Sequence, residues 1–158
     1  MRKTFLVPCL LGVSLLPASP QGPQAKEQRV TMDSLPAAVR KTATEQSKGA
    51  TLRGISTETE HGKTLYEVEL TVNGHTRDVL IAADGSVSEV EEETAVASLP
   101  APVKVTLEQE AAPGKIVKVE AVTKGGKLAF YEALVQKEGK KTDVSVGPDG
   151  KLMPKEKD

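Results

Sequence analysis

The stretch Leu-Pro-Ala-Ala-Val begins at Leu35, and Leu-Pro-Ala-Pro-Val begins at Leu99, 64 residues later in a chain of 158 residues. Further matches follow in the same order, with one inserted residue on the way: Gly62-Lys63 with Gly126-Lys127, Tyr66-Glu67 with Tyr131-Glu132, and Asp84-Gly85 with Asp149-Gly150. Self-similarity at a fixed spacing indicates a repeated folding unit. The spacing predicts two units of roughly 60 residues, near the lower size limit for a domain without disulfides or metals.

Each predicted unit begins with a helix. Ser34 and Ser98 stand where a hydroxyl oxygen can accept the unpaired N–H groups of a first helical turn. Pro36 and Pro100 suit that turn because a missing N–H costs nothing there. Apolar residues at helical spacing follow in both copies, so the sequence predicts one amphipathic helix in each.

Extended segments follow each helix, separated by pairs such as Asn73-Gly74 and Asp84-Gly85 that suit tight hairpins. We therefore predict an α+β fold of two tandem units, each with one N-terminal helix packed on a three- or four-stranded antiparallel meander sheet. Unit 1 spans residues 26–94, and unit 2 spans residues 95–158 with a short basic tail. Residues 1–25 are predicted to be a signal peptide and linker.

Strand alternation identifies a candidate partner surface in the second unit. Tyr131 and Ala133 are expected to face the helix, because side chains alternate between the two faces of a sheet. Phe130, Glu132 and Leu134 then share the opposite face, which is less polar than its counterpart in unit 1. Exposed apolar patches mark interfaces. Packing of Phe130 and Leu134 against the first unit is the alternative explanation.

The first 25 residues have the composition of an export signal. Arg2 and Lys3 precede an apolar run from Phe5 to Leu16, and a segment rich in Pro, Gln and Gly follows. The run is shorter than the roughly 18 residues that a membrane span needs. We expect a bacterial protein exported to the periplasm or secreted, with no stable membrane anchor after cleavage. Cys9, the only cysteine, lies in this segment, so no disulfide is expected in the remainder.

Composition and the histidines argue against several functions. The chain is 38% hydrophobic and 27% charged with a formal net charge of −1, which is typical of globular proteins and disfavours nucleic-acid binding. His61 and His75 both stand beside glycines at predicted turns, which favours a turn role over general-base or metal-ligand chemistry. We predict no catalytic residues, no cofactor and no enzymatic activity.

The acidic run from Glu89 to Glu93 is the densest charge cluster in the sequence. It lacks the ligand spacing of an EF-hand calcium loop. We interpret it as a solvated edge strand that leads into a linker, since charges on edge strands discourage aggregation. A metal-ion site, calcium above all, stays open as the alternative.

The chain resembles the PepSY and PepSY-like group, which includes domains similar to beta-lactamase-inhibitor protein. The resemblance rests on "LPAAV", "YEVEL" and "DVLIAADG" in the first copy, and on "LPAPV", "YEALV" and "DVSVGPDG" in the second. It implies an exported, non-catalytic module that binds another protein, such as a peptidase inhibitor or regulator. In inhibitor-like members, a surface formed by two tandem units grips the partner. The alternative function is a periplasmic module that binds a small ligand or a metal ion.

Overall fold

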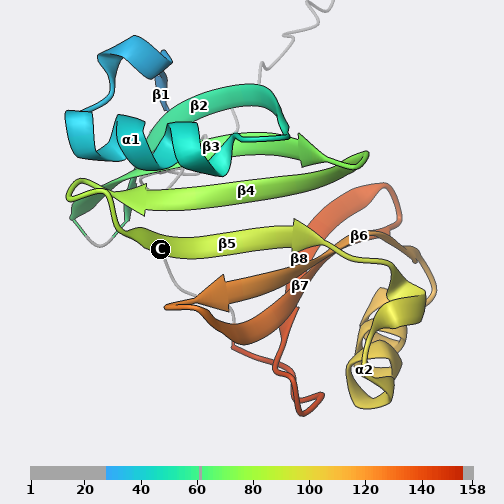
Figure 1. Ribbon diagram of the computed structural model, residues 1–158. Helices are drawn as coiled ribbons and strands as arrows, with labels where there is room; N and C mark the ends of the chain where they lie inside the picture. Colours follow the sequence, from blue (N-terminus) through green and yellow to red (C-terminus); the bar gives the residue numbers. More distant parts are fainter. Residues whose placement is uncertain (1–27, 61, 155–158) are drawn as a thin grey trace, which may run out of the picture.

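The computed structural model describes residues 28–60 and 62–154. These residues form one antiparallel sheet of eight strands, in chain order, with two α-helices (Figure 1). The predicted signal peptide and His61 lie outside the described residues. The helices are α1 (Ala37–Gln46) and α2 (Ala101–Ala111), and the strands are β1 (Gln28–Arg29), β2 (Thr51–Glu60), β3 (Lys63–Val72), β4 (His75–Ala82), β5 (Val87–Glu93), β6 (Lys115–Lys124), β7 (Lys127–Lys137) and β8 (Lys140–Val146).

The predicted fold class, two tandem units with a meander sheet each, is wrong. Strand β5 pairs with β4 on one side and with β6 on the other, where Glu89 lies opposite Lys124 and Glu93 opposite Glu120. The strands from both halves of the chain therefore form a single sheet. The interpretation of Glu89 to Glu93 as an edge strand is wrong for the same reason, because β5 lies in the middle of this sheet.

Both helices pack on the same face of the sheet. Val79, Val90 and Thr123 are neighbours in register across β4, β5 and β6, so they share a face. Val79 belongs to the core under α1. Val119, four residues from Thr123 along β6 and therefore on the same face, belongs to the core under α2. We call the opposite side of the sheet the helix-free face. The carboxylates of β5 that alternate onto this face are tolerated because no helix covers them.

Two hydrophobic clusters hold the helices to the sheet, at opposite ends of the molecule (Figure 1). Their buried members are Leu35, Val39, Ala43, Ile55, Val68, Leu70, Val79 and Ile81 in the first, and Leu99, Val103, Leu107, Ala111, Val119, Ala133, Val135 and Val146 in the second. The predicted alternation on β3 and β7 is thus confirmed.

The helix starts differ in detail from the sequence prediction. Pro36 and Pro100 are themselves the residues that precede the first helical turn, and neither helix has a side-chain cap. The Ser34 hydroxyl instead donates to the Thr31 carbonyl oxygen at 2.7 Å. Each helix is tied to a distant turn by a threonine that donates 2.7 Å hydrogen bonds to a glycine carbonyl, Thr42 to Gly85 and Thr106 to Gly150.

Candidate functional site

The helix-free face carries the strongest concentration of charge in the fold. Alternation and register place both carboxylates and apolar side chains on it. The carboxylates are Glu67, Glu69, Asp78, Glu89, Glu91, Glu93, Glu120 and Glu132, and the apolar residues are Leu65, Leu80, Val122, Phe130 and Leu134.

Several of these side chains are buried although no helix covers them. Val122 is 1% exposed and Glu120 is 7% exposed. Sheets twist along their length, and a twisted sheet lets the side chains of neighbouring strands cover one another on its hollow side. The face is therefore a packed surface with a partly desolvated centre.

Three carboxyl groups from three successive strands meet at that centre. Asp78 comes from β4, Glu91 from β5 and Glu120 from β6, and one carboxylate oxygen of each lies within 4.8 Å of the others. Register explains the meeting, because Asp78 lies opposite Glu91 while Glu120 lies next to Glu91's partner Val122. We call these three residues the carboxylate cluster.

Two members of the carboxylate cluster have a cationic partner. Arg53 Nη2 lies 2.5 Å from Asp78 Oδ1, and Lys118 Nζ lies 2.6 Å from Glu120 Oε1. Glu91 has no hydrogen-bond or ion-pair partner among the described residues. Burial, followed by the charges of Glu120 and other nearby carboxylates, raises the pKa of Glu91 to about 8. Glu91 is therefore a neutral acid at pH 7.

Burial also raises the pKa of Asp78 and of Glu67 above their ordinary values. Arg53 opposes this effect at Asp78, and the Ser56 hydroxyl, which donates to Glu67 Oε2 at 3.0 Å, opposes it at Glu67. The helix-free face thus holds protons above the pH at which exposed carboxyl groups lose them.

The predicted surface residues lie in one row along β7, beside the carboxylate cluster. Phe130, Glu132 and Leu134 are all partly buried, and neither Phe130 nor Leu134 belongs to either hydrophobic cluster. Lys124 Nζ lies 5.4 Å from the centre of the Phe130 ring, within cation–π range. The Ser145 hydroxyl donates to Glu132 Oε1 at 2.9 Å.

Sequence analysis did not find the carboxylate cluster. Glu120 reaches Asp78 and Glu91 only through the β5–β6 pairing, which local patterns do not encode. The one available signal was the alternation within Glu89 to Glu93, which places Glu91 on the face shared with Asp78.

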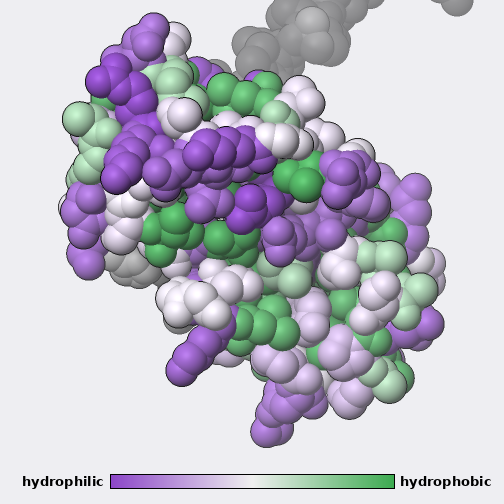
Figure 2. Space-filling model, in the orientation of Figure 1, coloured by the Kyte–Doolittle hydropathy of each residue, from purple (hydrophilic) through white to green (hydrophobic). Residues whose placement is uncertain are grey.

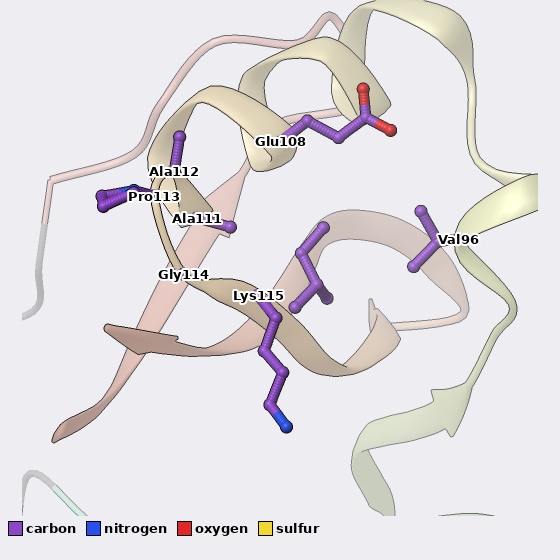
Figure 3. Close-up of a pocket in the computed structure, with 8 residues that line it drawn as sticks. Val96, Glu108, Ala111, Ala112, Pro113, Gly114 and Lys115 are labelled. Carbon is purple, nitrogen blue, oxygen red and sulfur yellow. The ribbon is translucent and has the colours of Figure 1, made fainter. Parts of the chain in front are cut away.

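Two further features are His75 and an open hollow at the end of α2. His75 is exposed at the start of β4, as a turn role predicts, with Nδ1 3.8 Å from Glu93 Oε1. An open hollow of about 350 Å³ lies at the end of α2 (Figure 3). Its charged lining residues, Glu108 and Lys115, point in different directions, and the rest of the lining is Val96, Ala111, Ala112, Pro113, Gly114 and Ile116.

Comparison with solved structures places the fold. A DUF2874 family protein from Bacteroides ovatus superposes with a TM-score of 0.60 at 19% identity, over 77% of this chain and 86% of its own. A BLIP-like protein from Bacteroides fragilis gives 0.53 at 19% identity, over 74% and 82%. A Bacteroides eggerthii protein assigned to the periplasm gives 0.61 at 18% identity, over 76% and 86%.

These likenesses establish a BLIP-like fold for the chain. No family model matches the sequence, and no curated protein matches it. The PepSY resemblance therefore remains a prediction, as do the two unit boundaries.

The surface and the helices complete the description. Figure 2 shows polar and charged residues over much of the visible side, with smaller apolar patches between them. Within residues 28–60 and 62–154, neither helix has the length and apolar character needed to cross a membrane.

Proposed function

We propose that this protein is an exported, non-enzymatic module that binds another protein through its helix-free face. The observation that carries the proposal is the contrast between the two faces of the sheet. One face is covered by both helices, and the other exposes a partly apolar, charge-rich surface that no described segment covers.

The row Phe130, Glu132 and Leu134 provides the anchors of this surface. Protein interfaces concentrate binding energy in a few partly desolvated aromatic and aliphatic residues, with charged groups around them. Phe130 and Leu134 are held at fixed positions by β7, and the carboxylate cluster begins on the neighbouring strand, where Glu120 lies opposite Glu132. Glu132 in this row is bonded to the Ser145 hydroxyl and, among the described residues, not to a cation, which favours a cationic partner surface.

The fold comparison supports a protein partner. One structural neighbour is named BLIP-like, and the resemblance noted in the sequence implies inhibitors or regulators of peptidases. A peptidase is the partner class that this combination favours. The predicted signal peptide and the neighbour assigned to the periplasm support an exported location.

Affinity capture with matched variants tests this proposal. The mature chain is used as bait in periplasmic extract, beside Leu134→Glu on the helix-free face and Val105→Glu on α2, where Val105 is 51% exposed. We expect the same captured protein with wild type and Val105→Glu, and its loss with Leu134→Glu. Circular dichroism must show that both variants fold. If Leu134→Glu unfolds the chain, or if it captures normally, the face is not the binding surface.

Divalent-cation binding is a second candidate, favoured by the carboxylate cluster. Three oxygens within 4.8 Å could hold calcium, but Arg53 and Lys118 already neutralise two of the three groups. A ligand that binds only the folded state raises the melting temperature. Melts of wild type and Glu91→Gln with and without calcium decide the question: a rise in wild type alone supports the site, and no rise removes it.

A further inference from the structure

The outer edge of β8 is one end of the eight-stranded sheet. Beyond β8, the chain makes one bridge, Val146 with Leu152, and one hydrogen bond from the Met153 N–H to the Ser145 carbonyl oxygen at 2.9 Å. No other described residue pairs with β8 on the side away from β7, and residues 140–143 are all exposed. A row of unpaired backbone groups is a template for another strand.

The corresponding strand in the first half of the chain, β4, has a neighbour at its outer edge. Strand β4 precedes β8 by 65 residues in the aligned sequence, and its outer edge is fully paired with β5. The Val146–Leu152 bridge repeats the Ile81–Val87 pair at that spacing. The chain therefore begins the corresponding strand beside β8. Pro154, which has no N–H to donate, stands at the position that corresponds to Glu89.

Backbone orientation defines which groups of β8 are available. The Ser145 carbonyl points away from β7, because it accepts from Met153. Backbone groups alternate sides along an antiparallel strand, so Asp143 and Lys141 also present their N–H and C=O groups outward. Because Met153 already occupies the Ser145 carbonyl, the edge from Lys141 to Asp143 is the part that offers backbone groups to one added strand.

The side chains of β8 specify the chemistry of that strand. Lys141 and Asp143 share the helix-free face, and Val144 packs partly against the second hydrophobic cluster on the other face. A complementary antiparallel strand carries an apolar residue opposite Val144, a cation opposite Asp143 and a carboxylate opposite Lys141. Leu152 and Met153, which are 53% and 38% exposed, extend the apolar contact at one end.

We propose that the β8 edge binds an extended segment of a partner protein, which adds as a ninth, antiparallel strand in the register that β5 takes on β4. From its N-terminal end, the segment has an apolar residue, then a cation, then any residue, then a carboxylate. Lys141 and Asp143 then disfavour indiscriminate pairing and select this charge order. The edge is a surface distinct from the helix-free face, and the proposal does not depend on the function proposed above.

Peptide titration of the isotopically labelled full chain tests the proposal. The probe has the sequence of residues 90–94 with the substitution Glu91→Lys, which places Val90 opposite Val144, the new lysine opposite Asp143 and Glu93 opposite Lys141. It omits residues 86–89, because the chain's own residues 151–154 already fill those positions beside β8. We expect saturable amide shifts confined to residues 140–146 and 152–153. A control peptide with Glu91→Pro should bind roughly tenfold more weakly, because it loses a ladder hydrogen bond. The Lys141→Glu variant should bind the probe roughly threefold more weakly.

Three results would overturn the proposal. The first is slow amide exchange at Lys141 and Asp143 in the free monomer, which would mean that the chain's own C-terminal residues fill the edge. The second is the same slow exchange in a dimer, which would make a second copy the occupant. The third is no saturable shift at millimolar probe, or equal affinity for the proline control.

Discussion

Glu93 of β5 lies directly opposite Glu120 of β6, at the junction of the two halves of the sheet. Each carboxylate is stabilised separately: the Thr76 N–H donates to Glu93 Oε2 at 2.9 Å, and Lys118 Nζ lies 2.6 Å from Glu120 Oε1. The hydrogen bond from the Thr76 N–H lowers the pKa of Glu93. Two like charges can therefore face each other in the middle of the sheet without separating the strands.

Glu91, two residues from Glu93 along β5, makes the stability of the fold depend on pH. Its pKa is about 8 in the folded protein, against an ordinary value of 4.5. Between these two values the unfolded chain has released the proton and the folded chain keeps it, so this contribution to stability falls as pH rises. It is fully present below pH 4.5 and lost above about pH 8.

The variant Glu91→Gln should remove most of that dependence. We expect it to exceed wild type in unfolding free energy by roughly 4 kcal/mol at pH 8 and nearly to equal it at pH 4.5. Urea melts at the two pH values measure this difference. Glu45→Gln, on the exposed side of α1, is the matched control. A Glu91→Gln curve parallel to wild type across this range would contradict the burial of a protonated Glu91.

Arg53 should stabilise the folded protein through Asp78, the β4 member of the carboxylate cluster. It pairs with Asp78, and its Nε donates to the Leu70 carbonyl oxygen at 3.0 Å. Arg53→Met leaves a buried carboxylate and a carbonyl without their donor, so we expect a loss of roughly 2 kcal/mol at pH 7. The loss should shrink in acid, where Asp78 is protonated. Arg40→Met on α1 serves as control, and equal small effects from both variants would show that the pair is unimportant.

Gly85 is required by both its backbone and its surroundings. Its φ is +86°, and a Cβ there would lie 2.9 Å from the Ala38 carbonyl oxygen of α1. Gly74 has nearly the same φ, +88°, but open space around it. Gly85→Ala should therefore cost clearly more than Gly74→Ala, which pays only the roughly 1 kcal/mol of left-handed strain. Thermal melts compare the two, and equal losses would show that α1 does not press on this turn.

Local patterns predicted the local structure well. The alternation Tyr66, Val68 and Leu70 was enough to assign the helix-facing side of β3, because a half-buried strand must alternate. The glycine pairs marked the hairpins for a similar reason, since tight hairpins need residues that accept positive φ.

The junction between β5 and β6 could not be predicted in this way. Carboxylates at Glu89, Glu91 and Glu93 are typical of a solvated edge, and only the three-dimensional arrangement shows what makes a central position possible. All three project onto the face that neither helix covers, and neighbouring cations compensate part of their charge, as Lys124 does at 3.1 Å from Glu89. The position of Phe130, Glu132 and Leu134 on one face of β7 followed from alternation alone, whereas the carboxylate cluster required strand order.

Site-specific photo-cross-linking in cells tests the central claim most directly. A photoreactive amino acid is placed at Phe130 on the helix-free face and, in a separate variant, at Val105 on α2. The account predicts a covalent adduct with one exported protein from position 130 and none from position 105. Adducts from position 105 with none from position 130 would contradict the assignment of the helix-free face as the binding surface.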